Sequence, residues 1–316
     1  MREELLAWMD TYPADPSWRD GTFAGAPAAA TVSKAVPDAI RATGMADGYL
    51  VQGSAGKGDW THTPWVAVLD PAETSTVEEG IYVVYLLSKG CERLYLTLNQ
   101  GCTTLKDESG IPAARAELTR RSAVMRARLK TERLKSLAID LNTDVWRADL
   151  YEHGVVLSTS YKRADLPSDG DLKRDLEEAL RLYRSVLDQG GWAADDQITA
   201  EAVRELGEVT LTEAKVYRRH RQIERNPSHS RLVKQIQGTV CKGCGKDPAQ
   251  TYGPIAAGMV EAHHLRPLSD LAAGESVTFD PRTDFAVLCP TCHRVIHRLE
   301  DAGDLEALRA LVLKHS

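Results

Sequence analysis

The sequence predicts an α+β protein in which a mixed α/β domain is followed by a helical connector and a small metal-bound domain. Short runs of β-branched and aromatic residues, such as 81–87, read as strands, and residues 172–187 carry apolar side chains at helical spacing. The last quarter of the chain instead carries cysteines and histidines at the spacing of metal ligands. We therefore expect three regions, at residues 1–190, 191–230 and 231–316.

The first region should open with helices and continue with strands. Residues 1–10 and 31–43 read as helices, separated by a loop-like segment rich in proline and glycine. Four strands with glycine-containing turns are expected over 49–51, 64–69, 80–87 and 93–98. After them we expect a basic helix over 113–137, a pair of strands over 151–161 and a helix over 172–187.

The connector and the last region continue this reading. Gly190 and Gly191 mark a boundary, and residues 195–230 form a helical connector that should end at Asn226-Pro227. Residues 285–288 read as a short buried strand. Pro290 suits the first turn of a helix that follows this strand.

Composition describes a soluble protein with room for two domains. The chain has 316 residues, of which 43% are hydrophobic, and its longest apolar run falls well short of the ~20 residues that cross a membrane. No signal peptide is evident at the start, so we expect a cytoplasmic protein in which Cys91 and Cys102 are reduced.

Charge is unevenly distributed. The net charge of −6 is not a general signature of nucleic-acid binding. However, residues 111–135 hold eight Lys and Arg against two Asp and Glu, and residues 210–240 hold seven against two. These segments either bind a phosphate backbone along its length or are ordinary solvated helix faces.

Two C-x-x-C pairs predict a structural zinc site. Each pair, Cys241 with Cys244 and Cys289 with Cys292, has glycine or proline beside it, as tight ligand turns require. Two such turns complete the tetrahedral shell of one Zn²⁺. Two disulfides are the alternative, disfavoured because nothing else in the sequence indicates an oxidising compartment.

Four histidines are interleaved with these cysteines. His263 and His264 are adjacent, and His293 and His297 are four residues apart, so that on a helix they project from one face. This arrangement predicts a second metal site rather than four unrelated histidines. Over residues 236–300 the chain resembles the HNH endonucleases, the ββα-metal nucleases, in their zinc-stapled form.

The resemblance implies a role for each residue of this set. His264 matches the general base, and His263, His293 and His297 match the ligand positions of the catalytic metal. The asparagine of the family falls at Asp284, which keeps an oxygen acceptor to orient His264. The added charge of Asp284 would favour the protonated form of that base.

The implied reaction is metal-dependent hydrolysis of a DNA phosphodiester that leaves a 5′ phosphate and a 3′ hydroxyl. A neutral histidine suits the base near pH 7, and a divalent metal stabilises the leaving oxygen. The candidate metals are Mg²⁺, Mn²⁺, Co²⁺ and Ni²⁺, of which Mg²⁺ suits imidazole ligands least. Basic residues that are either phosphate contacts or ordinary surface charges are Arg218, Arg219, Arg266, Arg294 and Arg298.

A second resemblance covers residues 1–190. The patterns G-x-G-x-W, P-W-I/V-A-x-x-D, G-x-Y-x-V-Y-L and L-x-L-N-Q-G resemble the McrB-type N-terminal domain, the modified-cytosine reader of methylation-dependent restriction systems. The glycine-rich loop at 53–60 is not a Walker loop, because Asp59 stands where Lys and then Ser or Thr are needed. We therefore expect no nucleoside triphosphate. Members fused directly to an HNH domain resemble stand-alone type IV restriction endonucleases.

Such readers turn the modified base out of the duplex into a pocket, where aromatic side chains stack on it. The aromatic candidates are Trp18, Trp60, Trp65, Tyr82 and Tyr85, with core packing as the alternative role. On a strand, Tyr82 and Tyr85 point to opposite faces, so at most one faces a pocket. The glycine-rich loop offers the polar candidates Ser54, Lys57 and Asp59.

The leading hypothesis is a type IV endonuclease that cuts double-stranded DNA containing 5-methylcytosine or 5-hydroxymethylcytosine. One active site cuts one strand, so a double-strand break implies a homodimer or two independent nicks. One alternative is an HNH nuclease that ignores cytosine modification or reads another mark, such as phosphorothioate. Another is a zinc-containing DNA-binding protein without catalysis, in which Asp284 marks a degenerate site.

Overall fold

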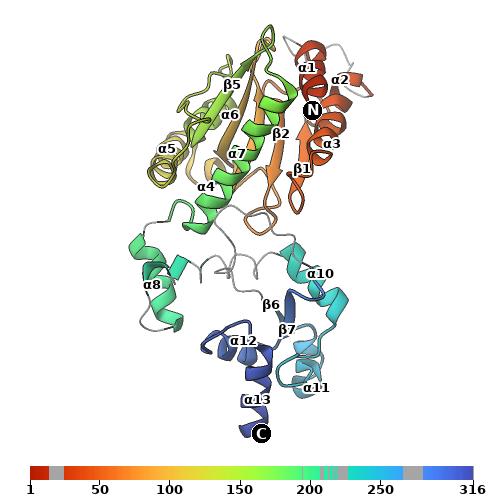
Figure 1. Ribbon diagram of the computed structural model, residues 1–316, viewed down its shortest axis with the longest axis vertical. Helices are drawn as coiled ribbons and strands as arrows, with labels where there is room; N and C mark the ends of the chain where they lie inside the picture. Colours follow the sequence, from red (N-terminus) through yellow and green to blue (C-terminus); the bar gives the residue numbers. More distant parts are fainter. Residues whose placement is uncertain are drawn as a thin grey trace. The chain divides into compact units, whose positions relative to one another are not determined.

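The computed structural model describes residues 1–13, 25–193, 195–206, 210–212, 214–215, 218, 227–265 and 280–315. The chain divides into two compact units (Figure 1). Unit 1 comprises Met1–Asp70 and Thr74–Ala193, and unit 2 comprises Pro71–Glu73 and Ala194–Ser316. None of the described helices has the length and apolar character that a membrane crossing requires.

Unit 1 has mixed α/β architecture. Its elements are, in chain order, α1 (Arg2–Thr11), α2 (Pro27–Ala30), the π-helical η1 (Thr31–Ala35), α3 (Val36–Arg41), β1 (Leu50–Ser54), β2 (Trp65–Leu69), β3 (Ile81–Leu87), β4 (Arg93–Gln100), α4 (Thr103–Ser109), α5 (Ile111–Ala127), α6 (Trp146–Gly154), β5 (Leu157–Lys162) and α7 (Asp169–Asp188). The helices expected near 1–10, 31–43 and 172–187 and the four expected strands are all present.

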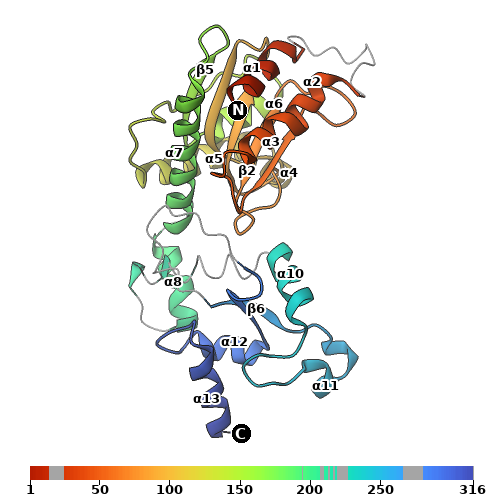
Figure 2. The same cartoon turned by 45° about the vertical axis from the view of Figure 1, so that its right-hand side comes forward.

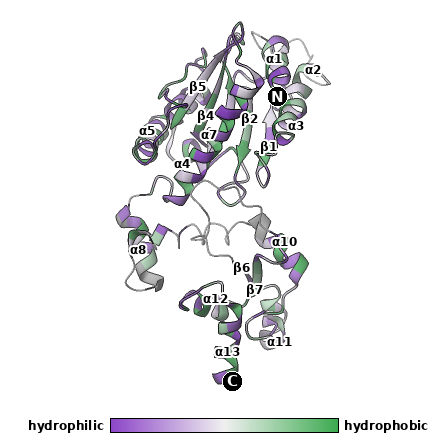
Figure 3. Cartoon of the chain, viewed as in Figure 1, coloured by the Kyte–Doolittle hydropathy of each residue, from purple (hydrophilic) through white to green (hydrophobic). Residues whose placement is uncertain are grey.

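The core of unit 1 is a five-stranded antiparallel sheet in the order β1-β2-β3-β4-β5. Across four strands the register aligns Val68, Val83, Leu98 and Leu157 in one row. Since alternate residues of a strand point to opposite faces, this row lies on one face of the sheet. Figure 3 shows strongly hydrophobic residues along the central strands, such as β2.

Helices cover both faces of the sheet (Figures 1 and 2). On the face of the Val68 row, α7 packs over β3 and β4, and η1 and α3 pack against β1. A Cβ at Gly53 would lie 2.1 Å from the Val32 carbonyl oxygen, so glycine permits this close approach. On the other face, the Asn99 amide donates to the Tyr151 carbonyl of α6 at 3.1 Å.

Two sequence predictions in this unit are wrong. The strand pair expected over 151–161 is a helix, α6, that ends at Gly154 and is followed by the single strand β5. A Cβ at Gly154 would lie 2.6 Å from Asn99 Oδ1, so this residue serves tight packing rather than a hairpin turn. Tyr151 and the valines after it have strand propensity, which tertiary contacts overrule.

The basic helix expected over 113–137 is shorter than predicted. The helix α5 ends at Ala127. A separate helix, α4, comes before it, and Gly110, with φ +78°, separates the two. The Arg128 guanidinium binds the carbonyls of Gln189, Gly191 and Ala193 at 2.7–2.9 Å. These contacts hold the segment beyond α7 against the end of α5.

Unit 2 contains short elements around a two-stranded sheet. They are α8 (Asp195–Leu206), α10 (Pro227–Gln237), α11 (Pro248–Tyr252), the 3₁₀ turn η2 (Pro254–Ala256), β6 (Glu261–His264), β7 (Phe285–Leu288), α12 (Pro290–Ile296) and α13 (Leu305–His315). Pro227, expected to end the connector helix, begins α10, and proline is favoured at this first position. The expected strand at 285–288 and the helix starting at Pro290 are both present.

The side chains of the antiparallel pair β6–β7 point alternately to two faces. The pairs are Ala262 with Val287, His263 with Ala286, and His264 with Phe285. The helix α10 contacts both strands, and Ala262, Phe285 and Val287 share a core cluster with its Val233. The other face, which carries His263 and Ala286, packs against α12.

Candidate metal centres and DNA-contacting residues

The four cysteines of the two C-x-x-C pairs meet in unit 2. Their sulfur atoms all lie within 4.8 Å of one another. Cys289 caps the N-terminus of α12, where its sulfur accepts from the Cys292 N–H at 3.5 Å. The first pair sits in a turn closed by the Gly245 N–H, which donates to the Cys241 carbonyl at 2.9 Å. Gly245 has φ +71°, a conformation that favours glycine.

This four-cysteine cluster fits Zn²⁺ and does not fit disulfides. All six cysteines of the chain are free thiols, and the Cys244 and Cys289 sulfurs are 3.9 Å apart. A tetrahedron with Zn–S bonds of ~2.3 Å has S–S edges of about 3.8 Å. A disulfide would need about 2.05 Å. The spacing is therefore that of four ligands around one ion.

Electrostatics support the same reading. Burial raises the pKa of Cys289 and of Cys292, and the charge of neighbouring cysteine sulfurs raises both further. Burial also raises the pKa of Cys241, but hydrogen bonds from backbone N–H groups outweigh it and lower the pKa overall. Thiolates gathered this closely need a cation, because without one their mutual repulsion favours protonation.

Three histidines form a second cluster. His263 on β6, His293 on α12 and His297 at its C-terminus place their ligand nitrogens within 4.8 Å of one another. The ring centroids are 4.8–5.1 Å apart. His263 is fully buried and His293 is 9% exposed. The strand and the helix, which are adjacent in Figure 1, thus bring together residues that are 30 positions apart.

The two histidines of α12 present nitrogens at metal-ligand spacing. His293 Nε2 lies 3.2 Å from His297 Nε2. Metal–nitrogen bonds of about 2.1 Å give N–N edges of roughly 3.0 Å in an octahedral shell and roughly 3.4 Å in a tetrahedral one. The spacing of this pair therefore suits ligands of one divalent cation in either geometry.

Hydrogen bonds fix which ring nitrogens face the centre. His293 Nδ1 is bound to a carboxylate oxygen of Glu261, and His263 Nε2 lies 2.7 Å from the Ala302 carbonyl oxygen. Each partner is an acceptor, so the bonded nitrogen carries the proton. The ligand atoms are then His293 Nε2 and His263 Nδ1. Carboxylate and carbonyl partners of this kind orient metal-binding histidines.

Glu261 and the loop around Ala302 are site residues that the sequence analysis did not assign. A signal was present for Glu261, because it stands two residues before His263 and so shares its face of the strand. The loop gave no such signal. It approaches β6 at Gly303, where a Cβ would lie 2.1 Å from the Leu265 carbonyl oxygen.

His264 lies apart from the three-histidine cluster, on the opposite face of β6. It is fully buried, with its ring centroid 5.1 Å from that of Phe285. The Asp284 carboxylate accepts from the Asp280 N–H at 2.8 Å within its own loop. The base role of His264 and the orienting role of Asp284 stay predictions.

The arginines proposed for phosphate contact have different surroundings. Arg294 and Arg298 are exposed and line a cavity of about 410 Å³ together with Pro290, Thr291 and Val295 of α12. Arg218 instead donates to Glu201 at 3.0 Å. Arg219 and Arg266 lie outside the described residues. Of the three described arginines in this set, the pair at α12 is the one placed beside the histidine cluster and open to a ligand.

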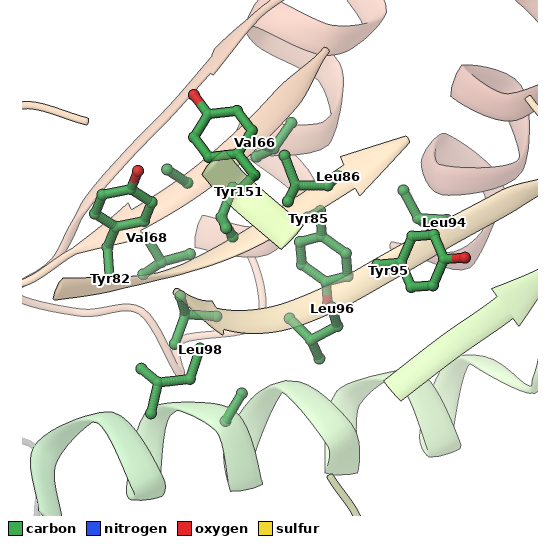
Figure 4. Close-up of a cluster of buried hydrophobic side chains, with 14 of the residues drawn as sticks. Val66, Val68, Tyr82, Tyr85, Leu86, Leu94, Tyr95, Leu96, Leu98 and Tyr151 are labelled. Atoms are coloured by element: carbon green, nitrogen blue, oxygen red, sulfur yellow. The ribbon is translucent and has the colours of Figure 1, made fainter. Parts of the chain in front are cut away.

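In unit 1, the aromatic candidates are mostly core residues. Trp60 is 3% exposed and packs edge-on against Tyr12, with ring centroids 5.2 Å apart. Tyr82 and Tyr85 are both buried and, as expected, point to opposite faces of the sheet (Figure 4). Trp65 is half-buried, and Trp18 lies outside the described residues.

The glycine-rich loop has a fixed base and an exposed tip. The Tyr12 hydroxyl donates to the carbonyls of Ala55 and Thr61 at 3.0 and 2.7 Å, and the Ser54 hydroxyl accepts from the Gly56 N–H. Lys57 and Asp59 are exposed at the tip. Among the described candidates of this region, these two are the most exposed to a DNA surface.

The basic residues beyond Ala113 are largely bound within unit 1. Arg115 pairs with Asp149 at 2.8 Å and Arg133 with Asp175 at 2.7 Å, and Arg126 donates to the carbonyls of Val155 and Val156. These contacts argue against an open phosphate track, and they give several of these arginines a structural role in place of the solvated helix face that was the alternative.

A polar cavity of about 640 Å³ opens elsewhere on unit 1. It is lined by residues of the loop before α6 and by their neighbours, namely Lys89, Asp140, Asn142, Thr143, Asp144, Val145 and Glu152. Burial raises the pKa of Glu152. None of the described aromatic candidates lines this cavity.

Comparisons with known proteins agree with part of this picture. The family model described as the MrcB-like, N-terminal domain matches residues 12–188. The type IV methyl-directed restriction enzyme EcoKMcrA of Escherichia coli (strain K12) is 27% identical over 160 residues, which cover 45% of this chain and 55% of that enzyme. The chain thus spans about half the length of this curated relative. No solved structure matches the chain.

Proposed function

Because the chain belongs to the family defined by the MrcB-like N-terminal domain, we propose that it is a modification-dependent DNA endonuclease of a type IV restriction system. Unit 1 would read 5-methylcytosine or 5-hydroxymethylcytosine in double-stranded DNA, and unit 2 would hydrolyse a phosphodiester at an HNH site. The similarity to a methyl-directed restriction enzyme supports the first part. The second part is supported by the site geometry.

One observation carries the nuclease proposal. Three histidines converge with their ligand nitrogens within 4.8 Å, and two of them are oriented by oxygen acceptors. Buried histidines are usually separate residues satisfied by local hydrogen bonds. Here two nitrogens lie 3.2 Å apart, a distance that suits a hydrogen bond or a shared cation, and the convergence of the third histidine on them supports the cation.

The residues of the site divide the work of hydrolysis. A divalent cation at the histidines would supply positive charge to the scissile phosphate and the leaving oxygen. His264 would accept the proton of the attacking water. Because its side chain is fully buried in this structure, this role requires that water gains access to it when DNA is bound. Arg294 and Arg298 would hold the phosphate backbone along α12. The four-cysteine cluster would bind Zn²⁺, and this cross-link would stabilise the small core of unit 2.

A plasmid cleavage assay tests the proposal. Unmodified, 5-methylcytosine and 5-hydroxymethylcytosine DNA are incubated with Mg²⁺, Mn²⁺ or Ni²⁺, with His264→Ala as the control protein. We expect cutting confined to modified DNA and abolished by the substitution. Equal cutting of all substrates would remove the reader function and retain the nuclease. Absence of cutting with every metal would leave a zinc-containing DNA-binding protein.

A further inference from the structure

An apolar turn projects from unit 2 between the first cysteine pair and β6. Tyr252, Ile255 and Met259 are 73%, 88% and 53% exposed, and Ile255 is the most exposed large hydrophobic side chain of the described chain. Single exposed apolar residues are common on protein surfaces, but three of them within eight residues make this turn a candidate interaction site.

The backbone of this turn is held in a defined shape. The Asp247 carboxylate caps α11 by accepting from the Ala249 N–H at 2.9 Å. Gly253, with φ +77°, ends this helix, and the buried Ala256 anchors η2 beneath the exposed tip. A preformed tip loses little conformational entropy when it binds a partner.

The chain segment that contains the turn is basic. Residues 231–260 contain Arg231, Lys234, Lys242 and Lys246 against Asp247 alone, and the next acidic residue, Glu261, binds His293. The Asp247 carboxylate is occupied by the helix cap and by the Thr239 hydroxyl, which donates at 2.8 Å. The Lys234 ammonium lies 3.5 Å from the Gly258 carbonyl oxygen, next to the turn. An apolar tip that is contacted by a lysine, within a basic segment, complements duplex DNA, whose phosphates are negatively charged and whose stacked bases are apolar.

We propose that the turn at residues 252–259 is a wedge that enters the minor groove of duplex DNA and separates a base step beside the nuclease site. Isoleucine, methionine and proline are typical wedge residues of minor-groove binders, and flanking lysines neutralise the phosphates. A stable protein–protein interface needs about 800 Å² from each partner, which three side chains do not provide. This inference rests on the proposed nuclease function.

The distance along the chain allows one duplex to reach both features. Ile255 and His263 are eight residues apart, so their Cα atoms are separated by at most ~28 Å. One turn of B-form DNA spans ~34 Å. The chain length therefore allows the wedge and the histidine cluster to contact the same helical turn of one duplex.

The test compares two neutral substitutions in the full-length protein, Ile255→Asn in the turn and Leu313→Asn on α13. Leu313 is 80% exposed and serves as the matched control, because it loses similar apolar area elsewhere in unit 2. The probe is a duplex with 2-aminopurine at successive positions. Binding is followed by anisotropy, base unstacking by 2-aminopurine fluorescence, and cleavage on the same duplex.

We expect Ile255→Asn to bind about tenfold more weakly and to lose the rise in 2-aminopurine fluorescence, while Leu313→Asn and Ile255→Leu behave as the parent protein. Equal binding and unstacking by both asparagine variants would overturn the wedge. A change in oligomeric mass of Ile255→Asn with unaltered DNA affinity would also overturn it and identify a protein contact. Cleavage by a protein whose binding and base unstacking do not depend on Ile255 removes the wedge alone. Binding that depends on Ile255 without cleavage removes the nuclease function alone.

Discussion

We expect the contact between Glu261 and His293 to determine how tightly the histidine cluster holds the proposed metal. Glu261 fixes the proton of His293 on Nδ1 and so turns Nε2 toward His297. The cluster is buried around His263, whereas Glu261 itself is exposed, so the carboxylate can be replaced without opening the core. Its contribution to metal binding can therefore be measured separately from its contribution to stability.

We expect Glu261→Gln to weaken binding of the catalytic metal about 10- to 100-fold. An amide oxygen still accepts a hydrogen bond, but it lacks the charge that raises the basicity of His293. Isothermal titration with Mn²⁺ or Ni²⁺ measures the affinity after the zinc site has been filled. Glu300→Gln, at another exposed carboxylate, is the control. Unchanged affinity in Glu261→Gln would show that the contact does not support a metal.

The two histidines of the doublet should separate metal binding from proton transfer. Because His263 faces the cluster and His264 faces α10, His263→Ala should lose affinity for the catalytic metal, whereas His264→Ala should retain it. Both variants should lose cleavage. Titration of metal binding beside the cleavage assay distinguishes them. Loss of metal affinity in His264→Ala would place this residue among the ligands instead.

How far the sequence determines the site depends on the kind of interaction. Cys241 and His293 were assigned from spacing alone, because metal ligands must recur at the intervals that turns and helices allow. Trp60 was assigned from a family pattern. The structure places it in the core against Tyr12, a contact between residues 48 positions apart that spacing cannot show. The contact of His263 with the Ala302 carbonyl could not be predicted either, because a backbone acceptor has no sequence signature.

Among the elements, the strands of unit 1 were more predictable than its long α4–α6 connection. A run such as β3 is apolar on both faces, because helices cover both sides of the sheet, and it reads as a buried strand in any context. The end of α5 depends instead on where Arg128 finds its carbonyl partners. Those partners lie about 60 residues further along the chain, so helical periodicity alone extended the helix too far.

The charges of α5 predict a pH-dependent contribution to its stability. Hydrogen bonds from Arg120, and then Arg121, lower the pKa of Glu117 to about 2, from 4.5 for an unperturbed glutamate. A lowered carboxyl pKa stabilises the fold above pH 4.5, and the gain disappears as the pH falls toward 2. Glu117→Gln should therefore reduce the free energy of unfolding at pH 7 by about 0.5–1 kcal/mol, because the pair is partly solvent-screened.

Urea unfolding of this variant at pH 7 and near pH 2.5 measures the effect, with Glu177→Gln on α7 as an exposed control. The difference from the parent protein should shrink at the lower pH. A difference of equal size at both values would mean that packing of the glutamate stem, rather than its charge, stabilises α5.

The whole chain combines two units with different sources of stability. Unit 1 has one extensive core cluster beneath and above its sheet. The described residues of unit 2 form two small clusters, one of which contains Cys241 and Cys292 themselves. A core of this size contributes little hydrophobic stabilisation, so we expect the proposed metal–thiolate bonds to supply much of the free energy of folding. Unit 1 has no comparable dependence among its described residues.

Removal of zinc should therefore unfold unit 2 and leave unit 1 folded. All six tryptophans lie within residues 8–192, so tryptophan fluorescence follows unit 1 alone. Addition of a strong zinc chelator should release one zinc per chain and abolish cleavage. The midpoint of thermal unfolding seen by tryptophan should stay unchanged. Cys289→Ser should reproduce the effect without chelator. A drop in the tryptophan-monitored midpoint in both experiments would mean that unit 1 depends on unit 2 for its fold, and the two units would then be one cooperative structure.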